Sequence, residues 1–244
     1  MVDIWLERTE LLIKEAGIEK LKKSNILIVG MGGVGSFAAE FIARSGVGNL
    51  TIVDGDVIDI TNINRQLPAL HSTVGDDKVE LMARRILDIN PELNLTRINE
   101  FLNPERMEEV IQAGNFDYIL DCIDSVSPKL ALIKAAKKNK IKIISCMGAG
   151  GKLDPSKVIV RDISKTRNCF LAKQVRKRLK KEGINKGFRC VFSTEIQRED
   201  SLKMTDGSNY KKSFYGTISY MPAIFGLYAA SEVIRYLIQA KIAE

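Results

Sequence analysis

The stretch NILIVGMGGVGSFAAEFIARSGVGNLTIVDGD, residues 25–56, decides the fold of this chain. An apolar run at 26–29 ends in the glycine-rich turn GMGGVG, and an alanine-rich segment with helical patterning follows at 36–44. A second apolar run, 50–53, stops at an aspartate. Strand, glycine turn, helix, strand and acid in this order are typical of a mononucleotide-binding βαβ unit.

The residues of this unit have separate expected tasks. Gly30 lets the chain turn out of the strand, Gly32 leaves room for a phosphate, and Gly35 lets the helix pack close to the sheet. Gly33, in the same turn, is a further candidate for cofactor binding. The amides at the helix start favour an anion. Asp54, which follows the second strand, can accept hydrogen bonds from ribose hydroxyls. NAD, FAD, S-adenosylmethionine and ATP all remain open at this point.

Length and composition indicate a globular protein. The 244 residues suffice for one large α/β domain, and 45% of them are hydrophobic. No charged leader precedes an apolar stretch at the start, so we expect no signal peptide. The cysteines form no CxxC pair, which argues against a structural zinc site or a disulfide framework and favours a reducing cytoplasm. They are Cys122, Cys146, Cys169 and Cys190.

The net charge of +7 is concentrated in one segment. Residues 165–189 hold ten basic residues and one acid, Glu182, so this segment carries +9 and the rest of the chain sums to −2. A localised cationic stretch favours contact with a nucleic acid, although a merely solvated helix face is the alternative. The candidate contacts are Lys173, Arg176, Lys177, Arg178, Lys180 and Lys181.

Strand and helix patterns alternate as far as residue 147. This predicts an α/β, Rossmann-like, doubly wound and mostly parallel sheet, with sites at the carboxyl ends of its strands. We expect a single domain built from an N-terminal helical arm, a nucleotide-binding core and a C-terminal extension, at 1–24, 25–147 and 148–244. Besides the unit above, we expect helices at 5–22, 76–90, 104–113 and 128–139, and strands at 93–98, 118–122 and 141–146.

The C-terminal extension has a less regular pattern. Short strands at 158–160 and 191–193 are expected to flank a basic helix at 171–181. Residues 197–213 are polar and patternless, which predicts a mobile loop. The apolar helix at 221–238 is expected to be a core or dimer-interface helix rather than a membrane span.

Polar residues after the second and fourth predicted strands favour ATP over NAD. Asn62, Arg65 and Lys78 follow Asp54, and a triphosphate needs more cationic neutralisation than a dinucleotide does. Asp124, after a buried strand, can hold Mg²⁺ together with phosphate oxygens. Each of these residues alone could be an ordinary surface charge.

Taken together, these motifs resemble the ThiF/MoeB/HesA superfamily, which is related to ubiquitin-activating enzymes. The resemblance implies that the chain binds ATP and magnesium and adenylates a substrate carboxylate. It rests on GxGxxG (30–35), DGD (54–56), TNINRQ (61–66), VGDDKVE (74–80) and DCIDS (121–125).

The resemblance also implies roles for single residues. Asp54, Asp56 and Asn62 would contact the nucleotide, Arg65 and Lys78 its phosphates, and Asp124 the magnesium ion. Arg8 matches the arginine that dimers of this superfamily donate into the partner's ATP site, which implies a homodimer with this cation supplied in trans. The implied catalytic residues are Arg8, Arg65, Lys78 and Asp124.

Over nearly its full length the chain is most similar to a tRNA-modifying branch of the superfamily, which cyclises threonylcarbamoyladenosine beside the anticodon by ATP-dependent dehydration. The resemblance implies adenylation of the threonyl carboxylate, ring closure by the neighbouring ureido nitrogen, and tRNA phosphates on the cationic segment. It rests on RTELL (8–12), IDSVSPK (123–129), GAGGKLDP (148–155), DISKT (162–166), LAKQVRKRLKK (171–181) and RCVFSTE (189–195).

Other functions stay open. One is adenylation of a ubiquitin-like sulfur carrier, with a sulfur-relay protein as partner and Cys169 as thioester carrier, although the CxxC motifs of that role are missing. A second is a nucleotide-sensing module without turnover, and a third is an NAD-linked oxidoreductase. We expect a cytoplasmic protein, an incidental reduced thiol at Cys169, and a surface or loop-ordering role for His71.

Overall fold

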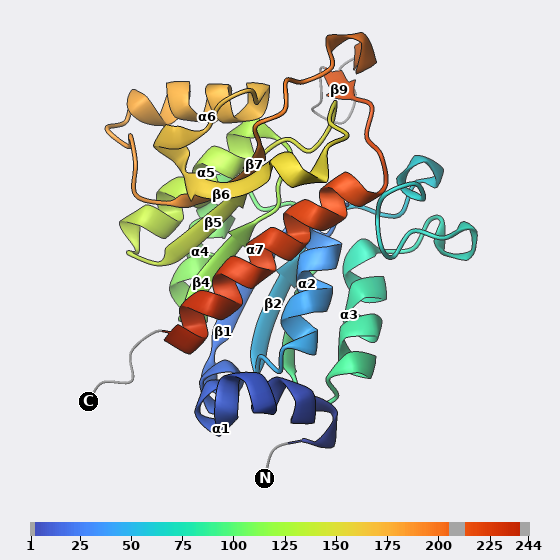
Figure 1. Cartoon of the computed structure of the whole chain (residues 1–244), viewed down its shortest axis with the longest axis vertical. Coiled ribbons are helices and arrows are strands. Elements are labelled where there is room, and N and C mark those ends of the chain that lie inside the picture. The colour runs from blue at the N-terminus through green and yellow to red at the C-terminus, as the bar shows by residue number, and fades with distance from the viewer. Residues whose placement is uncertain (1–2, 205–212, 240–244) are drawn as a thin grey trace.

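The computed structural model describes residues 3–204 and 213–239 and contains one seven-stranded sheet (Figure 1). The strand order is β3-β2-β1-β4-β5-β7-β6, and only the β6–β7 pair is antiparallel. The predicted doubly wound, mostly parallel sheet is therefore confirmed. The strands are β1 Asn25–Val29, β2 Asn49–Val53, β3 Asn94–Ile98, β4 Tyr118–Asp121, β5 Lys142–Cys146, β6 Val158–Asp162 and β7 Arg189–Ser193.

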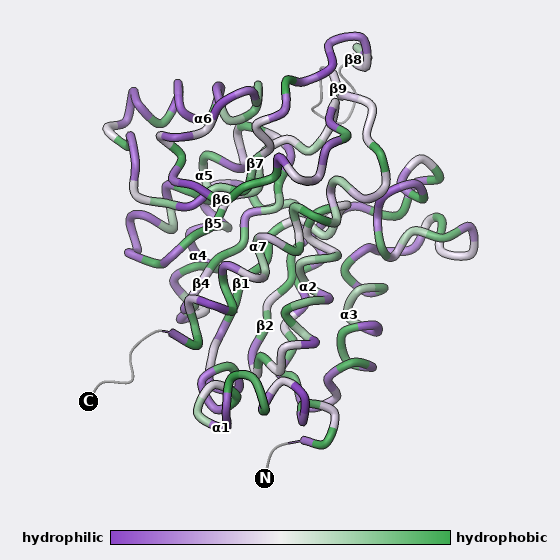
Figure 2. Tube along the Cα trace, viewed as in Figure 1, coloured by the Kyte–Doolittle hydropathy of each residue, from purple (hydrophilic) through white to green (hydrophobic). Residues whose placement is uncertain are grey.

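Helices cover both faces of the sheet, because the central strands are apolar on both sides. In β1, Ile26 and Ile28 belong to one buried cluster, whereas Leu27 and Val29 belong to the other. The tube in Figure 2 is accordingly green along β1 and more purple along α6. α2 Gly35–Arg44, α3 Lys78–Ile89 and α7 Tyr220–Gln239 pack with the first cluster, and α4 Pro104–Gly114, α5 Val126–Lys138 and α6 Phe170–Lys180 with the second.

The N-terminal arm lies at the end of the sheet where the strands begin (Figure 1). It consists of a short 3-10 helix, Ile4–Leu6, and of α1, Glu7–Lys23. Lys14 has a φ of 63° and interrupts α1, so the expectation of one or two helices agrees with a single kinked helix. The arm packs on the rest of the protein through Leu6, Ile18 and Leu21, which are all buried.

The last helix, α7, is a core helix. Met221, Phe225 and Val233 are fully buried, and a Cβ on Gly226 would lie 2.5 Å from the carbonyl oxygen of Val34. Within the described ranges α7 alone is long and apolar enough to cross a membrane by length and composition. Its burial against α2 and the sheet accounts for that apolar character.

The structure differs from the expected loop at 197–213. It forms a short 3-10 helix, Glu199–Ser201, followed by a hairpin of β8 Leu202–Met204 and β9 Ser213–Tyr215. Residues 205–212 lie outside the described part of the chain. Strands of three residues are too short to show an alternating pattern, so the sequence could not reveal this pair.

A fully buried ion pair joins α5 to the centre of the sheet. The Lys129 Nζ donates to Asp121 Oδ2 at 2.7 Å, to Ser145 Oγ at 3.2 Å and to the Cys146 carbonyl at 2.9 Å. These acceptors match the three N–H donors of an ammonium group. Burial raises the pKa of the Asp121 carboxyl, and the charge of Lys129 opposes that shift.

We expect Lys129→Met to destabilise the fold by about 3–5 kcal/mol, because Asp121 would remain buried without its cation. Urea unfolding followed by circular dichroism measures this change. Lys134→Met is the matched control on the same helix. Its exposed ion pair with Glu182, 3.1 Å long, should contribute no more than about 1 kcal/mol. Equal losses in the two variants would contradict the assigned role of Lys129.

Candidate active site

The glycine turn at the carboxyl end of β1 has a backbone that only glycine permits. Gly30 has a φ of +96°, and a Cβ there would lie 3.0 Å from the carbonyl oxygen of Cys122. A Cβ on Gly35 would overlap the Gly30 carbonyl. The first turn of α2 is therefore pressed against the end of the sheet, as the motif predicts.

Gly32 and Gly33 differ in the space that their missing side chains leave. A Cβ on Gly33 would lie 3.1 Å from both the Arg65 carbonyl and the Pro222 side chain. A Cβ on Gly32 would meet only the amide of Gln66, at 3.7 Å. The protein thus leaves open space at Gly32, which is the position expected to face a phosphate.

Asp54 holds this turn in place. Its Oδ2 accepts a hydrogen bond from the Met31 N–H at 2.6 Å, and its Oδ1 accepts one from the Asp56 N–H at 2.8 Å. Burial raises the pKa of the Asp54 carboxyl, and the charge of Lys78 with the two N–H donors opposes that shift. The sequence predicted a ribose contact here but not this clamp on the glycine turn.

Lys78 begins α3 beside the same strand end. Its side chain is 6% exposed, and its Nζ lies 2.8 Å from Asp56 Oδ2. The Lys78 N–H also donates to the Asp56 carbonyl at 3.1 Å. Asp56 was expected to contact the nucleotide, and in the structure it orients the lysine.

Arg65 and Asp124 come together from distant parts of the sequence. Burial lowers the pKa of the Arg65 guanidinium, and the negative charge of Asp124 is the largest effect that opposes this shift. Arg65 Nη1 donates to the Thr61 carbonyl at 2.8 Å and to Asn64 Oδ1 at 2.9 Å. Asn62 is buried one turn earlier and accepts from the Asp59 N–H at 3.2 Å.

The carboxyl edge of β1, β2 and β4 therefore gathers most of the predicted site. Arg8 is the exception, because it is exposed on α1 at the opposite end of the sheet (Figure 1). The edge gathers Gly30, Gly32, Gly33, Gly35, Asp54, Asp56, Asn62, Arg65, Lys78 and Asp124.

Gln66 is a polar side chain of this edge that sequence reasoning missed. Its amide lies beside Gly32, and its Oε1 is the only buried side-chain oxygen or nitrogen of the described residues without a hydrogen-bond partner. The available signal was its place directly after Arg65 in the TNINRQ motif.

Three of the four cysteines are buried, and the fourth is half-buried. Cys169 is 6% exposed and packs in the second core cluster, so its thiol has little access to a substrate. Cys146 and Cys190 are buried as expected, and Cys122 is half-buried. Within residues 3–204 and 213–239, no three His, Cys, Asp or Glu side chains come together in a cluster that could hold a metal ion.

On α6 the basic residues divide into two kinds. Arg176 is half-buried and donates to the carbonyl and the hydroxyl of Thr166, so it braces the preceding loop. The sequence pattern had grouped it with the exposed cations. Those that are exposed are Lys173, Lys177, Arg178, Lys180 and Lys181.

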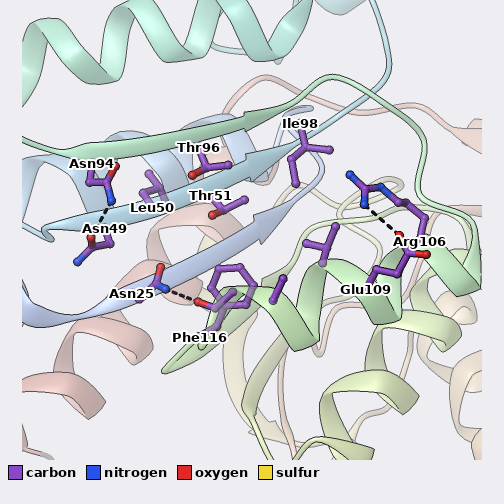
Figure 3. A pocket seen from close by; sticks show the side chains of 13 residues that line it. Asn25, Asn49, Leu50, Thr51, Asn94, Thr96, Ile98, Arg106, Glu109 and Phe116 are labelled. Carbon is purple, nitrogen blue, oxygen red and sulfur yellow. Dashed lines mark hydrogen bonds and ion pairs between the residues drawn. The ribbon is translucent and has the colours of Figure 1, made fainter.

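A separate pocket of about 390 Å³ lies between α4 and the beginnings of β1, β2 and β3 (Figure 3). Asn25, Asn49 and Asn94 occupy one register across these strands, and Asn94 donates to Asn49 at 3.1 Å. Arg106, on its rim, is paired with Glu109. None of the predicted site residues lines this pocket.

Fold and site together define a nucleotide-binding α/β protein with charged groups placed for work on phosphates, and comparison with known families agrees. The ThiF family model matches residues 6–244, and the chain belongs to this family. The resemblance drawn from the motifs is thus confirmed.

Individual relatives of the chain have a more narrowly defined activity than the family as a whole. The chain is 44% identical over 239 residues to the tRNA threonylcarbamoyladenosine dehydratase of Bacillus subtilis, which covers 95% of this chain and 94% of that protein. The Escherichia coli tRNA N6-threonylcarbamoyladenosine dehydratase solved with ATP superposes with a TM-score of 0.88 at 37% identity, over 98% of this chain and 97% of that one. The same enzyme has also been solved with AMP.

Similarity to a second activity is confined to part of the chain. The molybdopterin-synthase adenylyltransferase of Haemophilus influenzae is 36% identical over 158 residues, which covers 61% of this chain and 63% of that protein.

We expect Gly32→Ala to weaken the binding of ATP without destabilising the fold. Its Cβ meets no atom of the protein closer than 3.7 Å, so the unfolding midpoint should stay unchanged while affinity for ATP, measured by calorimetry, falls at least about tenfold. Gly226→Ala is the matched control and should instead destabilise the fold by about 1–3 kcal/mol through overpacking. Unchanged ATP affinity in Gly32→Ala would contradict the assigned cradle.

Proposed function

We propose that this protein catalyses the ATP-dependent dehydration of threonylcarbamoyladenosine in tRNA, which closes the threonylcarbamoyl group into a ring. One observation carries the proposal. The open glycine cradle and the charged side chains of Arg65, Lys78 and Asp124 meet at one sheet edge, in a chain similar over nearly its full length to enzymes of that name.

The chemistry needs one activation and one ring closure. A carboxylate oxygen of the threonyl group attacks the α-phosphorus of ATP, and pyrophosphate leaves. The ureido nitrogen then attacks the activated carbonyl carbon and loses its proton, and AMP leaves with the former carboxylate oxygen. The modified nucleoside has lost one water in total, and that oxygen ends in AMP.

The chain's own residues have roles in both steps. Arg65 and Lys78 supply the positive charge that the attack on phosphorus requires, and both are already oriented by Asn64 and Asp56. Holding the carboxylate beside the phosphorus makes the reaction between the two bound molecules effectively unimolecular, and holding the nitrogen beside the carbonyl orients the ring closure, which is already intramolecular.

Asp124 fits a magnesium ion of the kind that ATP carries. Mg²⁺ commonly uses one or two carboxylates and completes its shell with phosphate oxygens and water. Asp124 is exposed at this edge, near Arg65, and the described residues offer no all-protein cage. Bound there, the ion would neutralise phosphate charge.

The decisive experiment incubates the protein with ATP, magnesium and tRNA that carries threonylcarbamoyladenosine, and then weighs the digested nucleosides. We expect the loss of one water. Arg65→Ala and Asp124→Ala should each slow it by about 10²-fold or more, while the unfolding midpoint stays unchanged. Arg84→Ala, an exposed arginine on α3, serves as the control. ATP binding without dehydration of the modified nucleoside would refute the proposal.

The exposed cations of α6 are proposed to bind tRNA phosphates. Lys177→Glu with Arg178→Glu should weaken tRNA binding and flatten its salt dependence, because each lost phosphate contact lowers the slope by about one. Binding of ATP should not change. The control carries the same change of charge on other elements, at Lys23→Glu and Arg84→Glu. Equal tRNA affinities for the two double variants, measured across a salt titration, would exclude α6 as the tRNA contact.

A homodimer is proposed to complete the site, with Arg8 supplied in trans. Supporting this, Ile4, Leu11 and Leu12 on the same arm are 91%, 70% and 82% exposed, an apolar surface that a second copy could cover.

Mixing Arg8→Ala with Arg65→Ala, each inactive alone, should restore about a quarter of the wild-type rate, because half of the dimers then contain one intact site. No recovery after subunit exchange would exclude donation in trans.

Activation of a sulfur carrier is the weaker candidate. Similarity to an adenylyltransferase covers only part of the chain, and the buried Cys169 is a poor thioester carrier. We also propose that the protein acts in the cytoplasm, in keeping with a tRNA substrate and with cysteines that form no CxxC pair.

A further inference from the structure

The β8–β9 hairpin has two different faces. Lys203 lies directly opposite Phe214 in the antiparallel register, and Leu202 lies opposite Tyr215. Directly opposed residues share a face of a sheet, and successive residues alternate between the faces. Lys203 and Phe214 therefore share one face, and Leu202 and Tyr215 share the other.

The Tyr215 face is turned toward the glycine loop at residues 148–151. Cβ atoms built on Gly150 and Gly151 would lie 2.9 and 3.1 Å from the side chain of Tyr215. The opposite face therefore points away from this loop. On it Lys203 is exposed, and Phe214 is 48% exposed.

Hydrogen bonds tie this hairpin to the candidate active site. The Asn64 side chain donates to the Thr217 carbonyl at 2.9 Å and also accepts from Arg65. The Gly216 N–H donates to the Ser201 carbonyl at 2.8 Å, which closes the base of the hairpin. Phe214 precedes Thr217 by three residues, so at most about 11 Å of chain separates it from the residue bonded to Asn64.

The same network reaches the cationic helix. Gln197 accepts a hydrogen bond from the Phe170 N–H at 3.3 Å and donates to the Gly150 carbonyl at 3.1 Å. Phe170 is the first residue of α6 and is 58% exposed. Figure 1 shows the hairpin at the top of the molecule and α6 to its left. The segment that carries this exposed aromatic ring and lysine is thus linked by hydrogen bonds to Asn64 in the candidate active site, and through Gln197 to the first residue of α6.

We propose that the Lys203–Phe214 face binds the anticodon loop of the tRNA, with Phe214 stacked on an unpaired base next to the modified adenosine and Lys203 on an adjacent phosphate. This rests on the proposed dehydratase function. Single-stranded loops of RNA present unstacked bases, and aromatic side chains bind such bases by stacking. The positive charge of Lys203 and of α6 complements the phosphates that flank them.

The test uses the full chain and an anticodon stem-loop that carries 2-aminopurine beside the modified adenosine, because the fluorescence of this base falls when it stacks. Phe214→Ala and Phe214→Leu should each weaken binding by about tenfold and abolish the quenching, since neither side chain offers an aromatic face on which a base can stack. Phe214→Trp should retain both. ATP affinity should stay unchanged in all three.

Met204→Ala is the matched control, because Met204 is 69% exposed on the same hairpin but does not share the Phe214 face. It should bind the stem-loop within about twofold of the wild type. If Phe214→Ala binds and quenches like the wild type while the wild type dehydrates the nucleoside, the stacking proposal is wrong and the dehydratase function stands. If the wild type does not dehydrate it, the underlying function is wrong.

Discussion

The structure depends on how closely three backbone segments approach one another at the glycine turn. Gly35 brings the start of α2 against the Gly30 carbonyl, and Gly226 brings α7 against the Val34 carbonyl on the other side of the same helix start. α7 is the last helix in the described part of the chain, so a segment almost 200 residues later in the sequence packs against the glycine turn. A side chain at either glycine would separate these segments, and the amides of the turn would no longer be held in one arrangement.

Buried charge serves two distinct purposes around this turn. Lys129 and Asp121 neutralise each other beneath it, with every ammonium proton used inside the protein, so this pair stabilises the joint between α5 and the sheet. Lys78 has a single carboxylate partner, Asp56, which is about half exposed. A buried ammonium held by one partner at the rim retains donors for a further anion, whereas Lys129 retains none. Satisfaction of donors, rather than burial, distinguishes the structural lysine from the one suited to a phosphate.

Much of the fold followed from local patterns, and what failed was non-local. The apolar runs and the glycine turn predicted the central βαβ unit, since their periodicity and steric demands act within about 30 residues. Three features could not be read this way. Asp121 and Lys129 were parts of sequence motifs, and only the fold shows that they form a buried ion pair beside Ser145. Arg176 had the same pattern as its exposed neighbours, but it donates to Thr166. The β8–β9 hairpin packs against the loop at 148–151, which no local pattern indicates. In each case the deciding contact lies outside the element that carries the pattern, or the strand is too short to carry a signal.

The way in which the C-terminal extension is attached determines which of its residues can vary without disturbing the candidate active site. Its hydrogen-bonded junctions with residues 25–147 include the backbone pairing of β7 with β5 and the bond from the Met147 N–H to the Val191 carbonyl at 2.9 Å. The Asn64 amide adds a bond to the Thr217 carbonyl. Acceptors of this kind do not depend on which side chains the extension carries. Residues that face solvent on α6 and the hairpin can therefore change without moving Arg65 or the glycine turn, so the surface of the extension can vary while the candidate site at the sheet edge stays in place.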